Sequence, residues 1–263
     1  MGFWLLVLAH VIADFLLQGR NTARKKDQGR LSGYILHAVL VLGTFLVLFA
    51  QMLHPRLVLT LTVLSLLHIG QDAIKGFITR KLGSCSEAIV FLVDQGLHLL
   101  VLLCYWVYWL PINGSLPVVR WSLAGVLPEP GRSWFMQTIL PMLNEDLVIT
   151  LAIFIAVIYG GAVFVRKILD TSPVSLSADN ERSIGRILDT GRYIGMVERM
   201  ILLIFIAMDA FGAVAFVLTA KSIARYQELN QKEFAEYYLV GTLSSTAVAL
   251  LGGVLLRYLY SLS

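Results

Sequence analysis

The sequence predicts an all-α fold, a bundle of about seven helices that cross a membrane. Of its 263 residues, 57% are hydrophobic and 14% are charged, whereas soluble domains carry about 25% charged residues. The mean hydropathy is +0.76, so the chain lacks the polar residues that would cover a soluble core of this size. Apolar stretches of about the length of a bilayer crossing recur along the chain. These observations exclude a secreted protein and an ordinary cytosolic protein.

The first apolar stretch holds His10 and Asp14, and no basic residue precedes it. A cleaved signal peptide would have the opposite features, so we interpret this stretch as a span. The seven predicted helices cover about 3–19, 33–53, 57–79, 88–110, 147–166, 195–219 and 236–258.

Two long loops organise the predicted helices. An outer loop over residues 111–146, rich in proline, separates a four-helix unit (1–110) from a three-helix unit (147–263). An inner loop over residues 167–194 contains a Ser/Asp/Asn cluster that could begin a short amphipathic helix ending near Leu188.

The basic residues predict the orientation. If the N-terminus lies outside, 15 of the 21 lysines and arginines are inside, which the positive-inside rule favours. The six left outside are Arg56, Arg120, Arg132, Lys221, Arg225 and Lys232. We therefore expect a multi-pass protein of a bacterial inner membrane, with the N-terminus outside and the C-terminus cytoplasmic. Its expected partners are membrane lipids, and the scattered basic residues argue against nucleic acid.

Three of the predicted spans each carry a histidine and an aspartate four residues apart, a spacing that puts both side chains on one helical face. The order is His then Asp in the first and third spans and Asp then His in the fourth, which runs the other way. This reversal brings like residues to similar depths. With one histidine of the second span, the predicted cluster is His10, Asp14, His37, His68, Asp72, Asp94 and His98.

The cost of burying these side chains predicts that they face one another. An aspartate at the centre of a membrane helix costs about 2.5–3.5 kcal/mol, so it needs a partner inside the bundle. Imidazole and carboxylate groups without thiolates suit a divalent metal, Zn, Mn or Fe. Seven residues exceed the needs of one tetrahedral ion, so either two ions bind or some aspartates orient the histidines. Histidines that only pack, and a bis-histidine haem, are alternatives; haem ligation would not need the aspartates.

The leading hypothesis is a metal-dependent intramembrane hydrolase of a phosphoester or a lipid-linked substrate. His10, His68 and His98 would be the first ligands, with Asp14, Asp72, Asp94 and His37 completing a second metal site or serving as the base. The residues expected to be catalytic are Asp14, Asp72, Asp94 and Lys75. Lys75 follows His68 by seven residues and could hold a phosphate, or it could extend its ammonium to the membrane surface.

Two other functions remain open. The same cluster could relay protons or a divalent metal in a transporter or channel, although we find no inverted repeat and no helix broken by Gly or Pro. It could also hold a structural metal in a membrane scaffold.

The motif HVIADFLLQ at 10–18, with HIGQDAIK at 68–75 and DQGLH at 94–98, resembles a family of bacterial multi-pass inner-membrane proteins marked by an HxxxDFxLQ pattern. That family is known as a domain of unknown function. A C-terminal block with GRYIGMVERMILL, AKSIAR and AEYYLVGTLSS is similar to its longer members. The resemblance implies a membrane location and brings no activity. More distantly, the cluster resembles membrane-bound metal-dependent hydrolases.

The C-terminal block contains two further features. Asp209 lies near the middle of the predicted sixth span, where we expect structural ion pairing or a hydrogen bond across helices. Gly241, Gly252 and Gly253 in the last span predict close helix packing or a homodimer.

Overall fold

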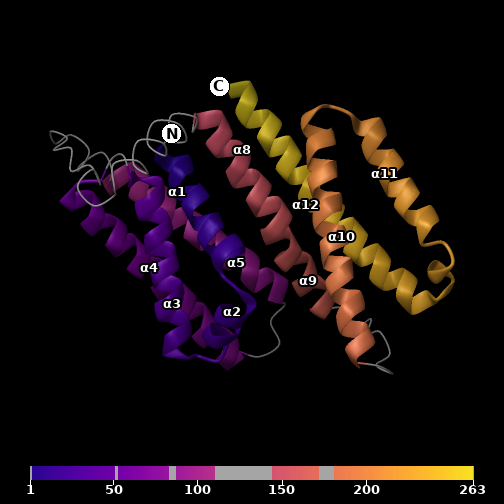
Figure 1. Cartoon of the computed structure of the whole chain (residues 1–263), viewed down its shortest axis with the longest axis horizontal. Coiled ribbons are helices and arrows are strands. Elements are labelled where there is room, and N and C mark those ends of the chain that lie inside the picture. Colours follow the sequence, from indigo (N-terminus) through magenta and orange to yellow (C-terminus); the bar gives the residue numbers. More distant parts are fainter. Residues whose placement is uncertain (1, 51–52, 83–86, 110–143, 172–180, 263) are drawn as a thin grey trace, which may run out of the picture. The chain divides into compact units, whose positions relative to one another are not determined.

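The computed structural model describes residues 2–50, 53–82, 87–109, 144–171 and 181–262 (Figure 1). Within these ranges all regular structure is helical, which confirms the all-α bundle. The chain forms two compact units. Unit 1 comprises Met1–Cys85 and Val90–Ala152, and unit 2 comprises Ser86–Ile89 and Ile153–Ser263. Most of the predicted outer loop and the Ser/Asp/Asn cluster lie outside the described residues.

Unit 1 contains the helices of the first four predicted spans, except for the first residues of the fourth span's helix, up to Ile89, which belong to unit 2. They are α1 (Gly2–Val11) with its π-helical continuation Ile12–Leu17, α2 (Arg20–Asp27), α3 (Leu31–Leu48), α4 (Pro55–Leu82), and α5 (Glu87–Cys104) with its π-helical continuation Tyr105–Trp109. Pro55 suits the first position of α4 because its missing N–H is not needed there. His54 caps this helix by accepting a hydrogen bond from the backbone N–H of Leu57 at 3.1 Å.

The first span is not one straight helix. The chain turns at Gln18 and Gly19, and α2 leaves the direction of Gly2–Leu17 at 94°. This finding corrects the expectation that no helix is broken. Residues 20–27, which the sequence analysis placed in a loop, form a short basic helix.

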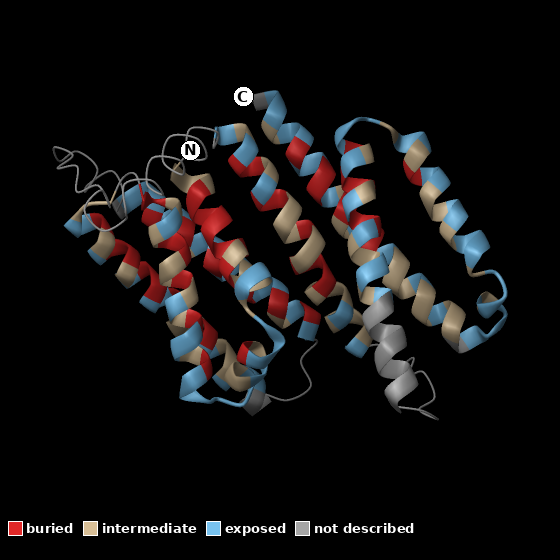
Figure 2. Cartoon of the chain, in the orientation of Figure 1, coloured by how far each residue is buried: buried red, intermediate tan, exposed pale blue. Residues whose placement is uncertain are grey.

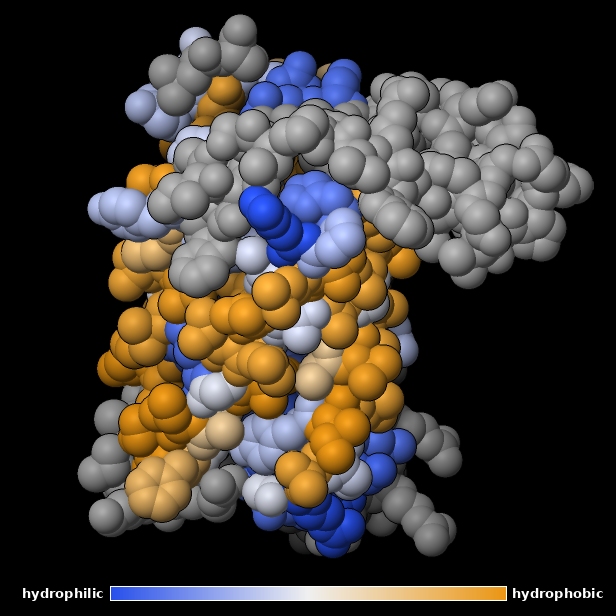
Figure 3. Space-filling model, turned by 90° about the vertical axis from the view of Figure 1, so that its left-hand side faces the viewer, coloured by the Kyte–Doolittle hydropathy of each residue, from blue (hydrophilic) through white to orange (hydrophobic). Residues whose placement is uncertain are grey.

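The interior of unit 1 is built around α1, most of which is buried (Figure 2). Leu6 and Leu8 of α1, Phe45 of α3 and Leu61 of α4 are almost completely buried. Other apolar side chains of α3 and α4 are exposed, and Figure 3 shows a broad band of hydrophobic residues with hydrophilic ones gathered toward its two ends. Such a band is the surface that lipid would cover.

Several helices have the length and composition of membrane spans. Within the described residues there are five, or six if the bent pair Gly2–Leu17 and Arg20–Asp27 counts as one span. The five are Leu31–Leu48, Pro55–Thr79, Glu87–Tyr108, Glu145–Thr171 and Phe234–Ser261. These helices support a membrane-spanning protein.

Unit 2 contains the C-terminal helices, and α8 begins in unit 1 and ends in unit 2. They are α8 (Glu145–Ile155) with its π-helical continuation Ala156–Gly160, α9 (Gly161–Thr171), α10 (Glu181–Ala207), α11 (Phe211–Ala224), a 3₁₀ turn (Glu228–Asn230) and α12 (Lys232–Leu262). The inner loop is shorter than the predicted 167–194, because α9 and α10 extend into it from both sides.

The continuous sixth span predicted over about 195–219 is wrong. Helix α10 ends at Ala207, and Asp209 adopts a left-handed conformation with φ of 62°. The N–H of Ala210 donates to the carbonyl of Phe205 at 2.8 Å. This hydrogen bond ends α10 with a C-terminal cap in which the left-handed position, here Asp209, is usually a glycine. No proline marks this turn and apolar residues continue on both sides, so hydropathy alone could not reveal it. Asp209 is exposed and pairs with Arg257, so it is not a buried intramembrane acid.

The glycines of α12 allow close packing inside unit 2. A Cβ atom on Gly252 would lie 2.3 Å from Cγ2 of Val157, and one on Gly253 would lie 2.5 Å from Cγ2 of Ile206. At Gly241 the nearest atom, on Leu169, would be an ordinary 3.6 Å away. Gly252 and Gly253 therefore serve the packing of helices within one chain, and the homodimer stays a prediction.

Candidate metal centre

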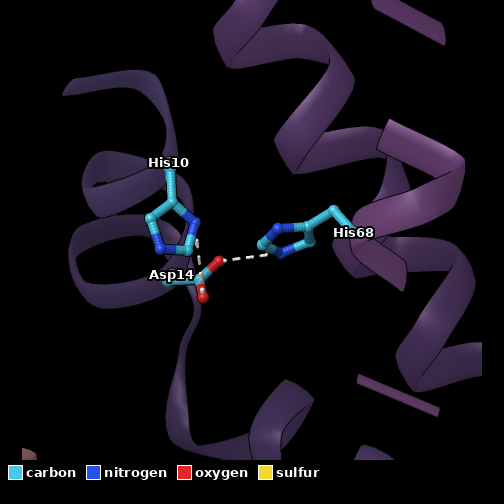
Figure 4. A group of neighbouring side chains, drawn as sticks. All are labelled: His10, Asp14 and His68. Atoms are coloured by element: carbon cyan, nitrogen blue, oxygen red, sulfur yellow. Dashed lines mark ion pairs between the residues drawn. The ribbon is translucent and has the colours of Figure 1, made fainter. Parts of the chain in front are cut away.

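The centre of unit 1 begins at the end of α1, where a regular helical turn gives way to a π-helical one. His10 is in the last turn of α1 and Asp14 is in the π-helical segment Ile12–Leu17. Turns of this kind are frequent at functional sites. Figure 4 shows these two side chains on one side and His68, from α4, pointing toward them from the other.

The closest group of possible metal ligands joins three helical segments. Nε2 of His68 lies 3.1 Å from Oδ1 of Asp14 and 3.1 Å from Nε2 of His37, and Nε2 of His37 lies 3.3 Å from the same Asp14 oxygen. Two ligands about 2.1 Å from one tetrahedral metal are about 3.4 Å apart. The three atoms thus form a triangle close to the face of a metal coordination tetrahedron.

Asp72 lies beside this triangle. Its Oδ2 is 3.3 Å from Nε2 of His37. Three overlapping groups have ligand atoms close enough to hold a metal ion: His10, Asp14 and His68; His37, His68 and Asp72; and Asp72, Asp94 and His98. Because His68 and Asp72 are each shared by two groups, the geometry accommodates one ion or two neighbouring ions.

The histidines of α1 and α5 are oriented by groups around them. Nδ1 of His98 lies 2.8 Å from the backbone carbonyl of Asp94, which leaves Nε2 of that ring facing the interior without a partner. Nε2 of His10 lies 3.2 Å from Oε1 of Gln95, and its Nδ1 has no hydrogen-bond partner. A second nitrogen bonded to an oxygen of the protein is the usual arrangement of a metal-binding histidine.

Two lysines bind the aspartates at one end of the cluster. Nζ of Lys26, on α2, lies 2.5 Å from Oδ2 of Asp72, and Nζ of Lys75 lies 2.7 Å from Oδ2 of Asp94. When the side-chain amide of Gln18 is oriented with its oxygen toward Lys26, that oxygen accepts a hydrogen bond from Nζ of Lys26 at 2.7 Å. Asp14, by contrast, has no lysine among these contacts.

The cluster is buried, and several of its polar atoms lack partners. The seven side chains are at most 7% exposed. Within the described residues, the buried atoms of this region without a hydrogen bond are Nδ1 of His10, Oδ1 of Asp14, Nδ1 of His37, Oε1 of Gln71 and Nε2 of His98, although Oδ1 of Asp14 lies 3.1–3.3 Å from the histidine nitrogens of the triangle. Buried polar atoms are rarely left so, and a bound ion is one explanation for them.

The structure brings together all seven residues that the sequence analysis singled out. The arrangement differs in detail, since His37, His68 and Asp14 make the closest group, whereas His10, His68 and His98 were expected to be the first ligands. The metal-binding and catalytic roles of these residues remain predictions. Lys75 also lies at the cluster.

Sequence reasoning missed the role of Lys26, which it counted among the loop cations. The available signal was local: the segment from Arg20 to Asp27 has no glycine or proline, and it is long enough for a helix of two turns. The 94° bend that carries this helix toward Asp72 has no comparable signal.

Comparison with known proteins finds a matching family model, but the function of that family is unknown. Residues 3–123 match the model of a family described as "Protein of unknown function (DUF3307)". All seven cluster residues and both lysines fall within the matched stretch. No curated protein and no solved structure matches the chain.

Proposed function

We propose that the domain of unknown function formed by residues 3–123 is a metal-dependent hydrolase domain, which acts inside a bacterial inner membrane on a phosphoester or lipid-linked substrate. The observation that carries the proposal is the triangle of His37, His68 and Asp14, whose 3.1–3.3 Å edges fit ligands of one divalent ion. Nitrogen and oxygen ligands without sulfur suit Zn, Mn or Fe.

The two lysines support a substrate with anionic oxygens. Lys26 and Lys75 place two ammonium groups beside the candidate ion site, and each can donate to a phosphate oxygen. Arg20, Arg24, Lys25 and Arg30 lie on or beside α2. Each basic residue near a membrane surface attracts anionic head groups by about 1 kcal/mol.

A metal bound to the triangle would activate a water molecule and polarise the phosphoryl oxygen. In the proposed reaction the water oxygen attacks phosphorus, and Asp72 takes the water proton after the substrate draws Lys26 away from it. The ester P–O bond breaks, and the leaving oxygen takes a proton from Lys75. Lys75 is 31% exposed and can regain its proton from water.

One observation favours a second candidate, a transporter of divalent metal ions or protons. The first span is broken at Gln18 and Gly19, and broken helices beside buried charges are typical of transport sites. Transport requires access to the cluster from both sides of the membrane, whereas the hydrolase requires one.

The test is metal analysis of the purified full-length protein, followed by phosphate release from a lipid phosphomonoester in vesicles. We expect about one or two divalent ions per chain, and loss of both metal and phosphate release in His68→Asn. His54→Asn is the matched control, because His54 lies outside the cluster and asparagine can also cap α4.

The outcomes separate the candidates. A folded wild-type protein that binds no Zn, Mn or Fe contradicts the hydrolase and the transporter of divalent metal ions. Metal binding without phosphate release, together with metal uptake into sealed vesicles, contradicts the hydrolase and supports transport.

A further inference from the structure

Buried polar atoms without partners gather in a second place. Besides those of the metal cluster, the described residues contain four more: Oε1 of Glu198, Nε of Arg199, the hydroxyl of Tyr238 and Oγ1 of Thr246. All four belong to α10 or α12 of unit 2. Such buried atoms are rare in folded proteins, and a bound ligand or ion is one explanation for them.

Arg199 is the centre of this region. Its side chain is 2% exposed. Nη1 donates to Oγ of Ser245 at 3.0 Å and Nη2 donates to the carbonyl of Ile158 at 3.1 Å, and both acceptors are neutral. A guanidinium group stays charged in proteins, and a buried charge without an opposite charge costs several kcal/mol. Arg199 therefore lacks the anion that its burial calls for.

One oxygen of the neighbouring carboxylate is already engaged. Oε2 of Glu198 accepts from Nζ of Lys221 at 2.5 Å, and the same ammonium lies 5.3 Å from the ring centre of Tyr238. Arg199, Lys221 and Glu198 together carry a net charge of +1. This net positive charge favours an oxyanion, to which a guanidinium group can donate hydrogen bonds.

Two glycines let helix backbone lie directly against the guanidinium group. A Cβ on Gly161 would lie 3.2 Å from Nε of Arg199, and one on Gly195 would lie 3.4 Å from Nη1. A side chain at Gly161 would therefore crowd the unpartnered Nε. The glycines bring backbone close to Arg199 and supply no negative charge to it.

We propose that unit 2 binds an oxyanion, a phosphate or carboxylate group, where α10, α12 and the segment Ala156–Gly160 meet, with Arg199 as its principal contact. The group can belong to a free anion or to a lipid head group, because the donors are the same for both. This proposal does not depend on the metal cluster or on hydrolysis.

The test uses thermal unfolding of the full-length protein in detergent. Inorganic phosphate and acetate are each titrated against chloride at constant ionic strength, in the presence of a metal chelator. At about ten times its dissociation constant, the bound anion should raise the unfolding temperature by about 3–6 °C. The rise should saturate, and it should disappear in Arg199→Gln.

Two variants keep the result interpretable. Arg257→Gln removes one positive charge from α12 at its pairing with Asp209, and it should keep the full rise. If Arg199→Gln does not fold, Arg199→Lys preserves the charge without the planar fork and should weaken anion affinity at least tenfold.

The source of the anion is tested in nanodiscs. A rise with phosphatidic acid over phosphatidylcholine, without a rise from inorganic phosphate, identifies a lipid head group, and the reverse identifies a free anion. The proposal is overturned if no anion raises the unfolding temperature of the wild type. It is also overturned if an anion raises the unfolding temperature of Arg199→Gln as much as that of Arg257→Gln. The anion test in unit 2 does not depend on the metal test, so its outcome still holds if the experiments with His68→Asn show that the metal proposal is wrong.

Discussion

The ammonium group of Lys221 lies 2.5 Å from the carboxylate of Glu198, although the two residues are 23 positions apart in the chain. The pair requires α11 to run back along α10 after the turn at Asp209, as the ribbon of unit 2 shows (Figure 1). Arg199 faces Ser245 and Asp209 pairs with Arg257, so α12 then runs in the same direction as α10. The hairpin returns the chain to the side on which α10 began.

This hairpin changes the expected topology. With the bent first pair counted as one span, the described residues contain six candidate crossings, and six crossings would put both termini on the same side. Lys221, Arg225 and Lys232 move to the inside and Arg257 moves to the outside. Of the 21 basic residues, 17 are then inside and 4 outside, a stronger positive-inside bias than the 15 and 6 of the seven-crossing arrangement. We therefore predict that the C-terminus lies outside.

Labelling of single cysteines in intact cells measures this topology. In a background with Cys85 and Cys104 replaced, a cysteine at Ser261 should react with a membrane-impermeant maleimide, and one at Gln227 should react only after the cells are opened. The opposite pattern at both positions would restore the cytoplasmic C-terminus.

The next prediction concerns Lys26. Lys26→Gln leaves the carboxylate of Asp72 buried without its nearest cation, and removing one partner of a buried pair costs about 3–5 kcal/mol. Lys25→Gln changes the net charge equally and should alter the free energy of unfolding by less than about 0.5 kcal/mol. The free energy of unfolding of both variants is measured on metal-free protein in detergent. Equal losses of this free energy would show that the Lys26–Asp72 pair has no special role.

The convergence of the histidines and aspartates in unit 1 was predictable from the sequence because burying these side chains is costly. Three aspartates in apolar spans, each four residues from a histidine, had to converge because each would be too costly alone. Lys26 escaped notice because its position depends on a bend between two helices. The turn at Asp209 escaped notice because it is formed by backbone hydrogen bonds, and the apolar residues on both sides look the same whether the helix continues or reverses.

The conformation of Asp209 gives a prediction that separates backbone strain from ion pairing. The left-handed region costs a residue with a Cβ atom about 1–2 kcal/mol, whereas an ion pair as exposed as Asp209 with Arg257 contributes about 0–1 kcal/mol. Asp209→Gly should therefore be as stable as the wild type to within about 1 kcal/mol. Asp209→Ala keeps the strain and loses the pair, so it should be the less stable of the two by about 1 kcal/mol. If the alanine variant equals the glycine variant in detergent unfolding, the turn does not require this conformation.

The last prediction concerns the glycine contact between α12 and the π-helical segment Ala156–Gly160. Gly252→Ala would place Cβ 2.3 Å from Cγ2 of Val157, so the helices must move apart, at a cost of about 1–3 kcal/mol in the free energy of unfolding. Gly241→Ala is the control, because its Cβ meets Leu169 at an ordinary 3.6 Å and alanine favours a helix.

Combining Gly252→Ala with Val157→Ala removes the atom that the new Cβ strikes. The double variant should therefore be more stable than the sum of the single effects predicts, by at least about 1 kcal/mol. Additive losses would show that Gly252 does not pack against Val157. A loss that depends on protein concentration would instead place Gly252 at a contact between two chains, because only association makes stability depend on the amount of protein present.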